Sequence, residues 1–188
     1  RIEIVEHSHA ALAHAYEAGA SRLPFAVLRG YVGTDFPAIN ADIRTITCPF
    51  TGQKLAAVPA INPDITFIHA LKADRAGNVL IEGIVGVQKE AVLAAGKAII
   101  TVEEVVDSFD SHPNAMILPH WVVTAIAHVP GGAHPSYAHG YYARDNATYK
   151  EWDAIAVDRD RFLVWMKTHV LDVDETVFAN RVIWSAGS

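Results

Sequence analysis

Two apolar segments, with a helical segment between them, most strongly limit the fold of this chain. Residues 64–70 and 97–102 are short, nearly continuous apolar runs of the kind that form buried strands. Between them, residues 85–95 have a helical pattern that stops at Gly96. Strands that alternate with helices of this length favour parallel pairing. The sequence therefore predicts an α/β fold with a largely parallel, twisted sheet flanked by helices.

The opening of the chain predicts another strand and helix. Residues 1–6 alternate between apolar and charged side chains, as in a strand, and Ser8 can then cap a helix that runs to about Ala18, with Gly19 as its stop. A second short apolar run covers residues 24–29 and leads into a loop. Because the first residue already lies in the predicted strand, we expect the chain to begin within a domain.

The last part of the chain has a different pattern. From about residue 146 the spacing of apolar and aromatic residues is helical, and no linker precedes it. We therefore expect residues 1–145 to form one α/β domain and residues 146–188 to be a helical tail of the same domain. The length of 188 residues is sufficient for one domain with its own core.

Charge and hydropathy exclude several classes of partner. The net charge is −6 and the basic residues are dispersed, so the sequence predicts no nucleic-acid partner. No apolar run approaches the roughly 18 residues of a membrane span, and no signal-peptide pattern is found, so no membrane association is expected. The single cysteine, Cys48, excludes an intrachain disulfide and fits a cytoplasmic location. The hydrophobic fraction of 51% predicts apolar surface that is covered in a subunit interface.

One segment carries a specific family resemblance. Residues 67–79 contain the pattern Ala-x-x-Ala-Asp-x-x-Gly-Asn, in which x is any residue. This pattern resembles a stretch in the A subunits of family I CoA-transferases. Residues 18–25, 32–34 and 100–106 resemble further stretches of that family in the family's order. Residues 130–136 are similar to the glutaconate CoA-transferase branch, which includes hydrolases of CoA thioesters. The resemblance covers residues 1–145 and weakens over the tail.

The resemblance implies a fold, a reaction and a partner. The fold is CoA-transferase-like and Rossmann-like, and the family has an opening βα portion that this sequence lacks. The reaction moves coenzyme A between carboxylic acids through a glutamyl-CoA intermediate, whose nucleophilic glutamate comes from a B subunit. The expected ligands are an acyl-CoA and a carboxylic acid, and no permanently bound cofactor is expected.

Candidate catalytic residues lie where the first strand meets the first helix. On alignment of the Ala-Gly-x-x-x-Leu-Pro-Phe stretch, His9 occupies the position of a substrate-contacting glutamine of 3-oxoacid transferases, and the hydrolase branch has a catalytic glutamate in this neighbourhood. Histidine can act as a general base. Glu6 and His7 are further catalytic candidates, and Ser8 is a candidate for binding an anion together with the helix N-terminus.

The loop after the second apolar run supplies candidate binding residues. Gly33 and Thr34 follow a strand end, where open α/β sheets bind their ligands, and Arg29 can pair with a carboxylate, although a structural salt bridge explains it equally well. We expect no metal, because His7 and His9 have metal-ligand spacing but no third ligand is fixed by spacing.

Two other functions stay open at this point. The first is hydrolysis of an acyl-CoA thioester with ring cleavage, which the histidine at position 9 favours. The second is a ligand-sensing domain without enzymatic activity, because related α/β folds serve in regulators.

Overall fold

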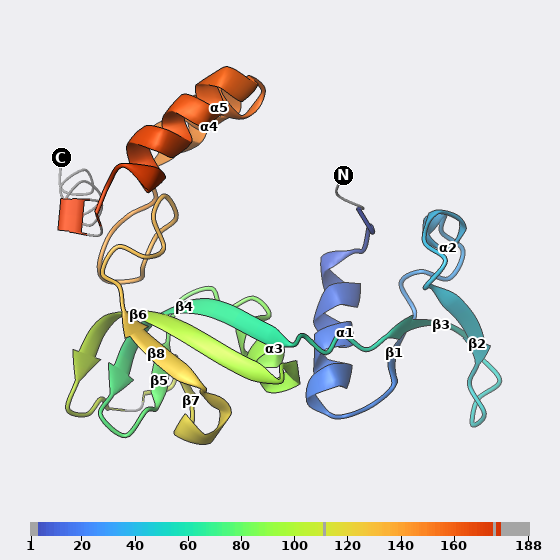
Figure 1. Ribbon diagram of the computed structural model, residues 1–188. Helices are drawn as coiled ribbons and strands as arrows, with labels where there is room; N and C mark the ends of the chain where they lie inside the picture. The colour runs from blue at the N-terminus through green and yellow to red at the C-terminus, as the bar shows by residue number, and fades with distance from the viewer. Residues whose placement is uncertain (1–3, 111, 175, 178–188) are drawn as a thin grey trace. The chain divides into compact units, whose positions relative to one another are not determined.

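The computed structural model describes residues 4–110, 112–174 and 176–177 (Figure 1). The chain divides into two compact units. Unit 1 contains the residues up to 67 and residues 85–99, and unit 2 contains residues 68–84 and the residues from 100 onward. The boundary crosses two long strands, β4 and β6, whose first three residues belong to unit 1. The predicted division at residue 145 stays a prediction.

Unit 1 consists of a small sheet and helices. Its helices are α1 (His9–Ala20), α2 (Phe36–Ile39) and α3 (Gln88–Ala94). Its strands β1 (Phe25–Leu28), β2 (Arg44–Thr47) and β3 (Lys54–Pro59) form a sheet in the order β1-β3-β2, and both pairings are antiparallel. The connection between β2 and β3 is a short turn, and such a turn joins strands only as a hairpin.

Helix α1 packs in unit 1 through its smallest residues. Ser8 caps the helix, since its hydroxyl accepts from the amide of Ala11 at 3.2 Å. Ala11, Ala15 and Ala18 repeat at helical spacing and are buried. Gly19 lies inside the helix instead of ending it, and a Cβ there would be 2.2 Å from the carbonyl oxygen of Ile61. The core around α1 comprises Ala11, Ala15, Ala18, Ala26, Tyr31, Ile43, Ala56 and Val58.

The second sheet has five strands, in the order β7-β5-β4-β6-β8. They are β4 (Ile65–Asp74), β5 (Val79–Ile81), β6 (Lys97–Val106), β7 (Met116–Leu118) and β8 (Ala125–His128), and a 3-10 turn, η1 (His120–Val122), precedes β8. Both pairings of β5, with β4 and with β7, are antiparallel. Contacts between β4 and β6 advance in the same direction along both strands, from the Ile68–Thr101 pair through His69–Glu103 to Arg75–Asp107, so these strands run parallel.

The predicted α/β class is confirmed, but the expectation of a largely parallel sheet needs correction. The predicted strand, helix and strand over residues 64–102 are confirmed as β4, α3 and β6. The antiparallel pairs arise because several connections are too short for a crossover. In the turn after β4, the carboxylate of Asp74 accepts from both the backbone and the side-chain nitrogen of Asn78 at 2.8 Å, which closes the β4–β5 hairpin.

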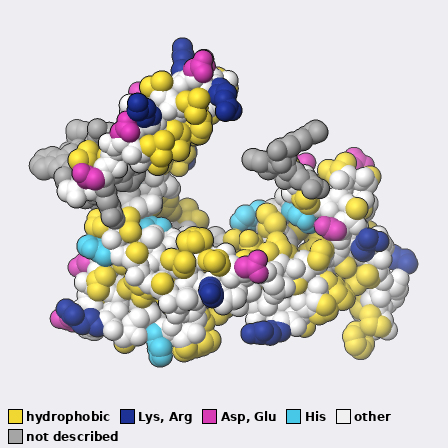
Figure 2. All heavy atoms as spheres, viewed as in Figure 1, with side chains coloured by type: hydrophobic (Ala, Val, Ile, Leu, Met, Phe, Trp, Pro, Cys, Tyr) yellow, Lys and Arg dark blue, Asp and Glu magenta, His cyan; other side chains and the backbone are white. Residues whose placement is uncertain are grey.

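The predicted strand over residues 1–6 has no counterpart among the described residues. Residues 4–8 are irregular, and residues 1–3 lie outside the described part of the chain. The predicted helical tail is confirmed over residues 146–171 as α4 (Asn146–Ala156), α5 (Arg159–Met166) and the π-helical turn η2 (Lys167–Leu171), while its last part, residues 178–188, lies outside the described residues. Trp152 contacts Trp165 edge-on, with ring centroids 4.9 Å apart, and so holds α4 against α5. Apolar side chains gather along one side of the tail in Figure 2. Val157, Leu163 and Val164 are exposed residues of the tail.

The start of α4 depends on an ionised carboxylate. The pKa of Asp145 is lowered from 3.8 to about 2, because the backbone amide and the hydroxyl of Thr148 both donate to its carboxylate. The hydrogen bonds that lower this pKa stabilise the folded tail while the carboxylate is ionised, at pH values above about 4. This stabilisation is lost as the pH falls from about 4 to about 2 and the carboxylate becomes protonated. Asp145→Ala is expected to cost about 1 kcal/mol at neutral pH. Urea unfolding followed by tryptophan fluorescence measures the free energy of unfolding of the variant and of the wild type. The difference between the two should vanish near pH 2. Asp153→Ala, at an exposed position of α4, is the control, and equal effects of the two substitutions would contradict the prediction.

Candidate functional site

A cleft of about 910 Å³ lies in unit 1, at the start of α1. Its walls come from the first turn of α1, the end of β1, the loop that follows β1, and the β2–β3 hairpin. Of the residues predicted to bind the substrate, Ser8, Arg29 and Thr34 line this cleft together. Segments that lie far apart in the sequence thus meet at one cavity, as a ligand site requires.

Ser8 presents the N-terminus of α1 to the cleft. Its backbone amide donates to the hydroxyl of Tyr31 at 2.7 Å, and its own hydroxyl caps α1. Ala10, in the first turn, also lines the cleft. The first amides of a helix have no intrahelical partners and carry a partial positive charge, so this end of α1 favours an anion.

The loop after β1 brings a cation and a hydroxyl to the same cleft. Arg29 is exposed, and none of the ion pairs found among the described residues involves it. The hydroxyl of Thr34 donates to the carbonyl of Tyr31 at 3.0 Å, which fixes the loop. Gly33 has φ of 81°, a left-handed conformation that suits glycine, but it does not line the cleft. The cleft can therefore pair a carboxylate with Arg29 at one wall.

The predicted catalytic residues lie beside the cleft and do not line it. His9 is exposed on the first turn of α1, and Glu6 is exposed in the segment before the helix. His7 is partly buried, and its Nε2 lies 3.1 Å from the side-chain nitrogen of Asn40. A catalytic role for these three residues stays a prediction.

Cys48 lines the same cleft, at the turn between β2 and β3. The pKa of its thiol is lowered, first by a hydrogen bond from the side chain of Thr51 and then by the backbone of Phe50 and Thr51. His14 and Gln53 are further polar residues of the lining. Sequence reasoning did not select these three residues, because they belong to a helix face and a hairpin turn whose spacing carries no motif.

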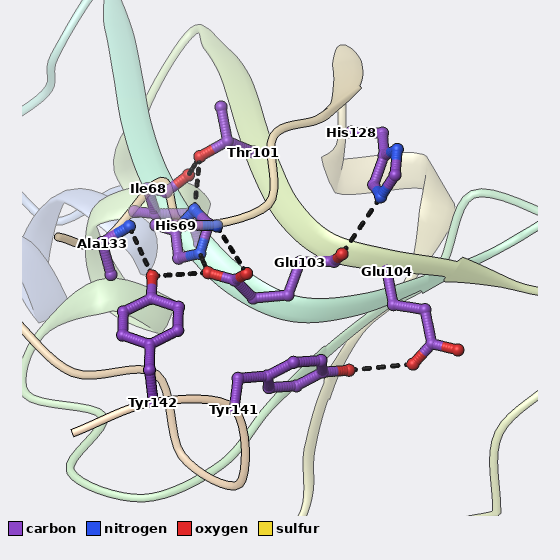
Figure 3. A network of polar contacts seen from close by, with 10 residues as sticks. Ile68, His69, Thr101, Glu103, Glu104, His128, Ala133, Tyr141 and Tyr142 are labelled. Carbon is purple, nitrogen blue, oxygen red and sulfur yellow. Dashed lines mark hydrogen bonds and ion pairs between the residues drawn. The ribbon is translucent and has the colours of Figure 1, made fainter. Parts of the chain in front are cut away.

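Unit 2 contains a buried carboxylate with three hydrogen-bond donors (Figure 3). Glu103, on β6, is 6% exposed. It accepts from Nε2 of His69 at 2.6 Å, from the hydroxyl of Tyr142 at 2.6 Å and from the amide of Gly131 at 2.7 Å. Since each donor comes from a different segment, Glu103 joins β4, β6 and the chain before α4.

The Gly131-Gly132 turn is tied down by this cluster. The amide of Ala133 donates to the hydroxyl of Tyr142 at 2.9 Å, and the amides of Gly132 and His134 donate to carbonyls of the same turn. A Cβ on Gly132 would be 2.8 Å from the His69 ring. Because these amides already have acceptors, the turn offers no free donors for an oxyanion, and the interpretation as a structural turn fits it better than one as an anion site.

No group of three or more His, Cys, Asp or Glu side chains in the described part of the chain is placed to hold a metal ion. None of the described helices combines the length and the apolar character needed to cross a bilayer.

Residues 1–128 match the family model described as Coenzyme A transferase. The chain belongs to the coenzyme A transferase family. The resemblance predicted from residues 67–79 is thereby confirmed. Residues 67–79 cover most of β4 and the β4–β5 turn, where Asp74 and Asn78 close the turn and the side chain of Asn78 accepts from the amide of His120 at 3.0 Å.

Three comparisons place the chain within this family. It is 60% identical over 169 residues to the A subunit of 3-oxoadipate CoA-transferase from Pseudomonas knackmussii, a match that covers 90% of this chain and 60% of that protein. It is 32% identical to the IpdA subunit of the cholesterol ring-cleaving hydrolase from Mycobacterium tuberculosis, over 77% of this chain and 53% of that protein. The crystal structure of glutaconate CoA-transferase from Acidaminococcus fermentans superposes with a TM-score of 0.83 at 26% identity, over 93% of this chain and 61% of that one.

The chain spans about 60% of the length of the 3-oxoadipate relative. The predicted likeness to glutaconate CoA-transferase is confirmed by the structural match. Both transferases and a hydrolase occur among the relatives of this coenzyme A transferase family member, so its fold alone does not select the reaction.

Proposed function

We propose that this chain is part of the A subunit of an enzyme that transfers coenzyme A between two carboxylic acids, one of them a 3-oxo dicarboxylic acid such as 3-oxoadipate. The observation that carries the proposal is the 60% identity to the A subunit of a 3-oxoadipate CoA-transferase, over 90% of this chain. A B subunit would complete the enzyme, which we place in the cytoplasm. The cleft of unit 1 would receive the acid or the acyl group.

The reaction divides into two acyl transfers. The carboxylate of a B-subunit glutamate attacks the carbonyl of the acyl-CoA, the thiolate of CoA leaves, and an anhydride forms. The thiolate then attacks the glutamyl carbonyl of the anhydride, which releases the first acid and leaves a glutamyl-CoA thioester. The second acid reverses both steps and leaves as its CoA ester. No water or external proton is consumed.

The cleft residues would bind and orient the acid. A dicarboxylic acyl chain carries one reacting carboxyl and one free carboxylate. Arg29 supplies a cation that is not engaged in any ion pair found in the described residues, and the N-terminus of α1 at Ser8 supplies partial positive charge. Charged hydrogen bonds to both would hold the free carboxylate, so that the reacting carboxyl faces the partner's glutamate.

A direct test combines the chain, within its full-length A subunit, with the matching B subunit. With 3-oxoadipate as acceptor and a panel of acyl-CoA donors, we expect a 3-oxoacyl-CoA ester to form only when both proteins are present, as measured by chromatography of CoA esters. Reduction with borohydride after incubation with acyl-CoA should mark the glutamyl thioester on the B subunit. Absence of exchange with every donor, while CoA is released without an acceptor acid, would contradict transfer.

Replacing Arg29 tests the binding role of the cleft. Loss of a charged hydrogen bond worth about 1.5–3 kcal/mol predicts that Arg29→Ala raises KM for the dicarboxylic acid by about 10- to 100-fold, with a smaller change in kcat. Arg44→Ala, an exposed arginine on β2 outside the cleft lining, is the matched control. Steady-state kinetics with a dicarboxylic and a monocarboxylic acid separate the effects, and equal KM changes for both acids would refute the pairing.

The second candidate function is hydrolysis, which is favoured by the 32% identity to the IpdA protein and by the exposed His9 at the start of α1. An imidazole there could act as general base toward water. Release of free CoA without an acceptor acid, abolished by His9→Gln, would support this reaction instead of transfer.

A further inference from the structure

Two buried polar side chains hold the segment that leads into α1. Tyr31 and Asn40 are only 2% and 5% exposed. The hydroxyl of Tyr31 accepts from the amide of Ser8 at 2.7 Å, and the side-chain nitrogen of Asn40 donates to the carbonyl of Glu6 at 3.0 Å. The residue between these two points, His7, is therefore anchored on both sides.

The orientation of Asn40 assigns the protonation state of His7. The side-chain oxygen of Asn40 accepts from the amide of Asp42 at 2.9 Å, so its NH₂ group is the one that faces Nε2 of His7 at 3.1 Å. Nε2 must then be an acceptor, and the ring proton lies on Nδ1. Nδ1 is buried and has no partner among the described residues. The Nε2 lone pair is engaged in this contact.

We propose that Asn40 is a positioning residue of the cleft: it holds His7 as the neutral Nδ1–H tautomer and so fixes Ser8 and the N-terminus of α1 toward the bound carboxylate. This inference rests on the proposed function. Tyr31 acts with Asn40 by fixing the amide of Ser8. If a group that orients a substrate, such as the N-terminus of α1, is displaced by about 1 Å, much of its contribution to catalysis is lost.

Protonation of His7 opposes this arrangement. A proton on Nε2 would face the NH₂ group of Asn40, and two donors repel each other. The side chains that face His7 in the described contacts are the amide of Asn40 and the ring of Tyr31, whose centroid lies 6.5 Å from that of the imidazole. Neither is a carboxylate, so the described contacts hold Nε2 of His7 as a hydrogen-bond acceptor.

The first experiment measures the tautomer directly. Nitrogen NMR of the ¹⁵N-histidine-labelled protein, with His7→Gln to assign the signal, should show His7 as the Nδ1–H tautomer at neutral pH. The Nε2–H tautomer in the wild-type protein would overturn the proposal. This result is independent of any transferase activity, so failure of the proposed function and failure of this inference are distinguishable.

The second experiment compares Asn40→Ala and Asn40→Asp in the complete enzyme. Asn40→Ala removes the side-chain bonds to Glu6, His7 and Asp42, so we expect it to raise KM for the acid by about tenfold or more while kcat changes little. Asn40→Asp puts an acceptor where the NH₂ group was, so it should move the ring proton of His7 to Nε2 in the nitrogen NMR spectrum. It should also raise KM, because the bond to the carbonyl of Glu6 is lost. Tyr31→Phe, which keeps the stacking on Phe36, should raise KM without altering the tautomer of His7. An unchanged His7 tautomer in Asn40→Asp would overturn the proposal.

Discussion

Glu103→Ala is expected to lower the free energy of unfolding of unit 2 by about 3–5 kcal/mol, because it leaves one buried and two partly buried donors without an acceptor. The donors are His69, Tyr142 and the amide of Gly131. A domain of this size is stable by about 5–15 kcal/mol, so the loss is a large part of the total. Glu103→Gln should cost less than alanine, since one oxygen still accepts.

Urea unfolding followed by tryptophan fluorescence measures this effect, because Trp121, Trp152 and Trp165 all belong to unit 2. The matched control is Glu104→Ala. Glu104 is the next residue on β6, its side chain is 47% exposed, and its pair with Lys72 is a surface pair worth about 0–1 kcal/mol. A Glu103 variant no less stable than the Glu104 variant would show that the buried cluster contributes little.

Gly19→Ala is expected to destabilise unit 1 by about 3 kcal/mol, although the same change in most helices is stabilising by about 0.5–1 kcal/mol. The added Cβ would lie 2.2 Å from the carbonyl oxygen of Ile61 and 3.1 Å from the Cβ of Ala94. Backbone atoms cannot rotate away as a flexible side chain can. Helix α1 would have to shift away from residue 61 and from α3.

Hydrogen exchange of the α1 amides reports this change, since the tryptophans of the chain all follow residue 120. Gly30→Ala is the control, because nothing lies within 4 Å of a Cβ at that position and its φ is ordinary. We expect Gly30→Ala to leave protection of α1 unchanged. A stable Gly19→Ala variant with normal exchange rates would mean that α1 does not approach residue 61 this closely.

The sequence predicted those elements whose signals are local. The apolar runs at 64–70 and 97–102 and the N-cap at Ser8 depend on neighbouring residues, and all three appear where expected. Strand direction was predicted less well, because it depends on which strands pair and not on any one strand's composition. The sequence predicts a helix end at Gly19, whereas the helix continues to Ala20, because nothing local reveals that Ile61 lies against this glycine.

In the candidate site, too, residues with a local sequence signal were predicted and residues with distant partners were not. Ser8, Arg29 and Thr34 were predicted from a cap, a strand end and a family resemblance, and the structure brings them to one cleft. Tyr31 and Asn40 were missed, because their partners lie 23 to 34 positions away in the sequence. Buried residues whose role is to hold another segment have no spacing signal of their own. Only the folded structure reveals them.

The alanine face of α1 limits how the cleft can respond to a ligand. The backbone of the helix is also joined to residue 61 directly, since the amide of Ile61 donates to the carbonyl of Ala15 at 3.0 Å. A contact made of backbone and methyl groups has no rotamers that could absorb a small displacement. We therefore expect a displacement at the first turn of α1 to move the helix as a rigid body and to strain its packing against α3.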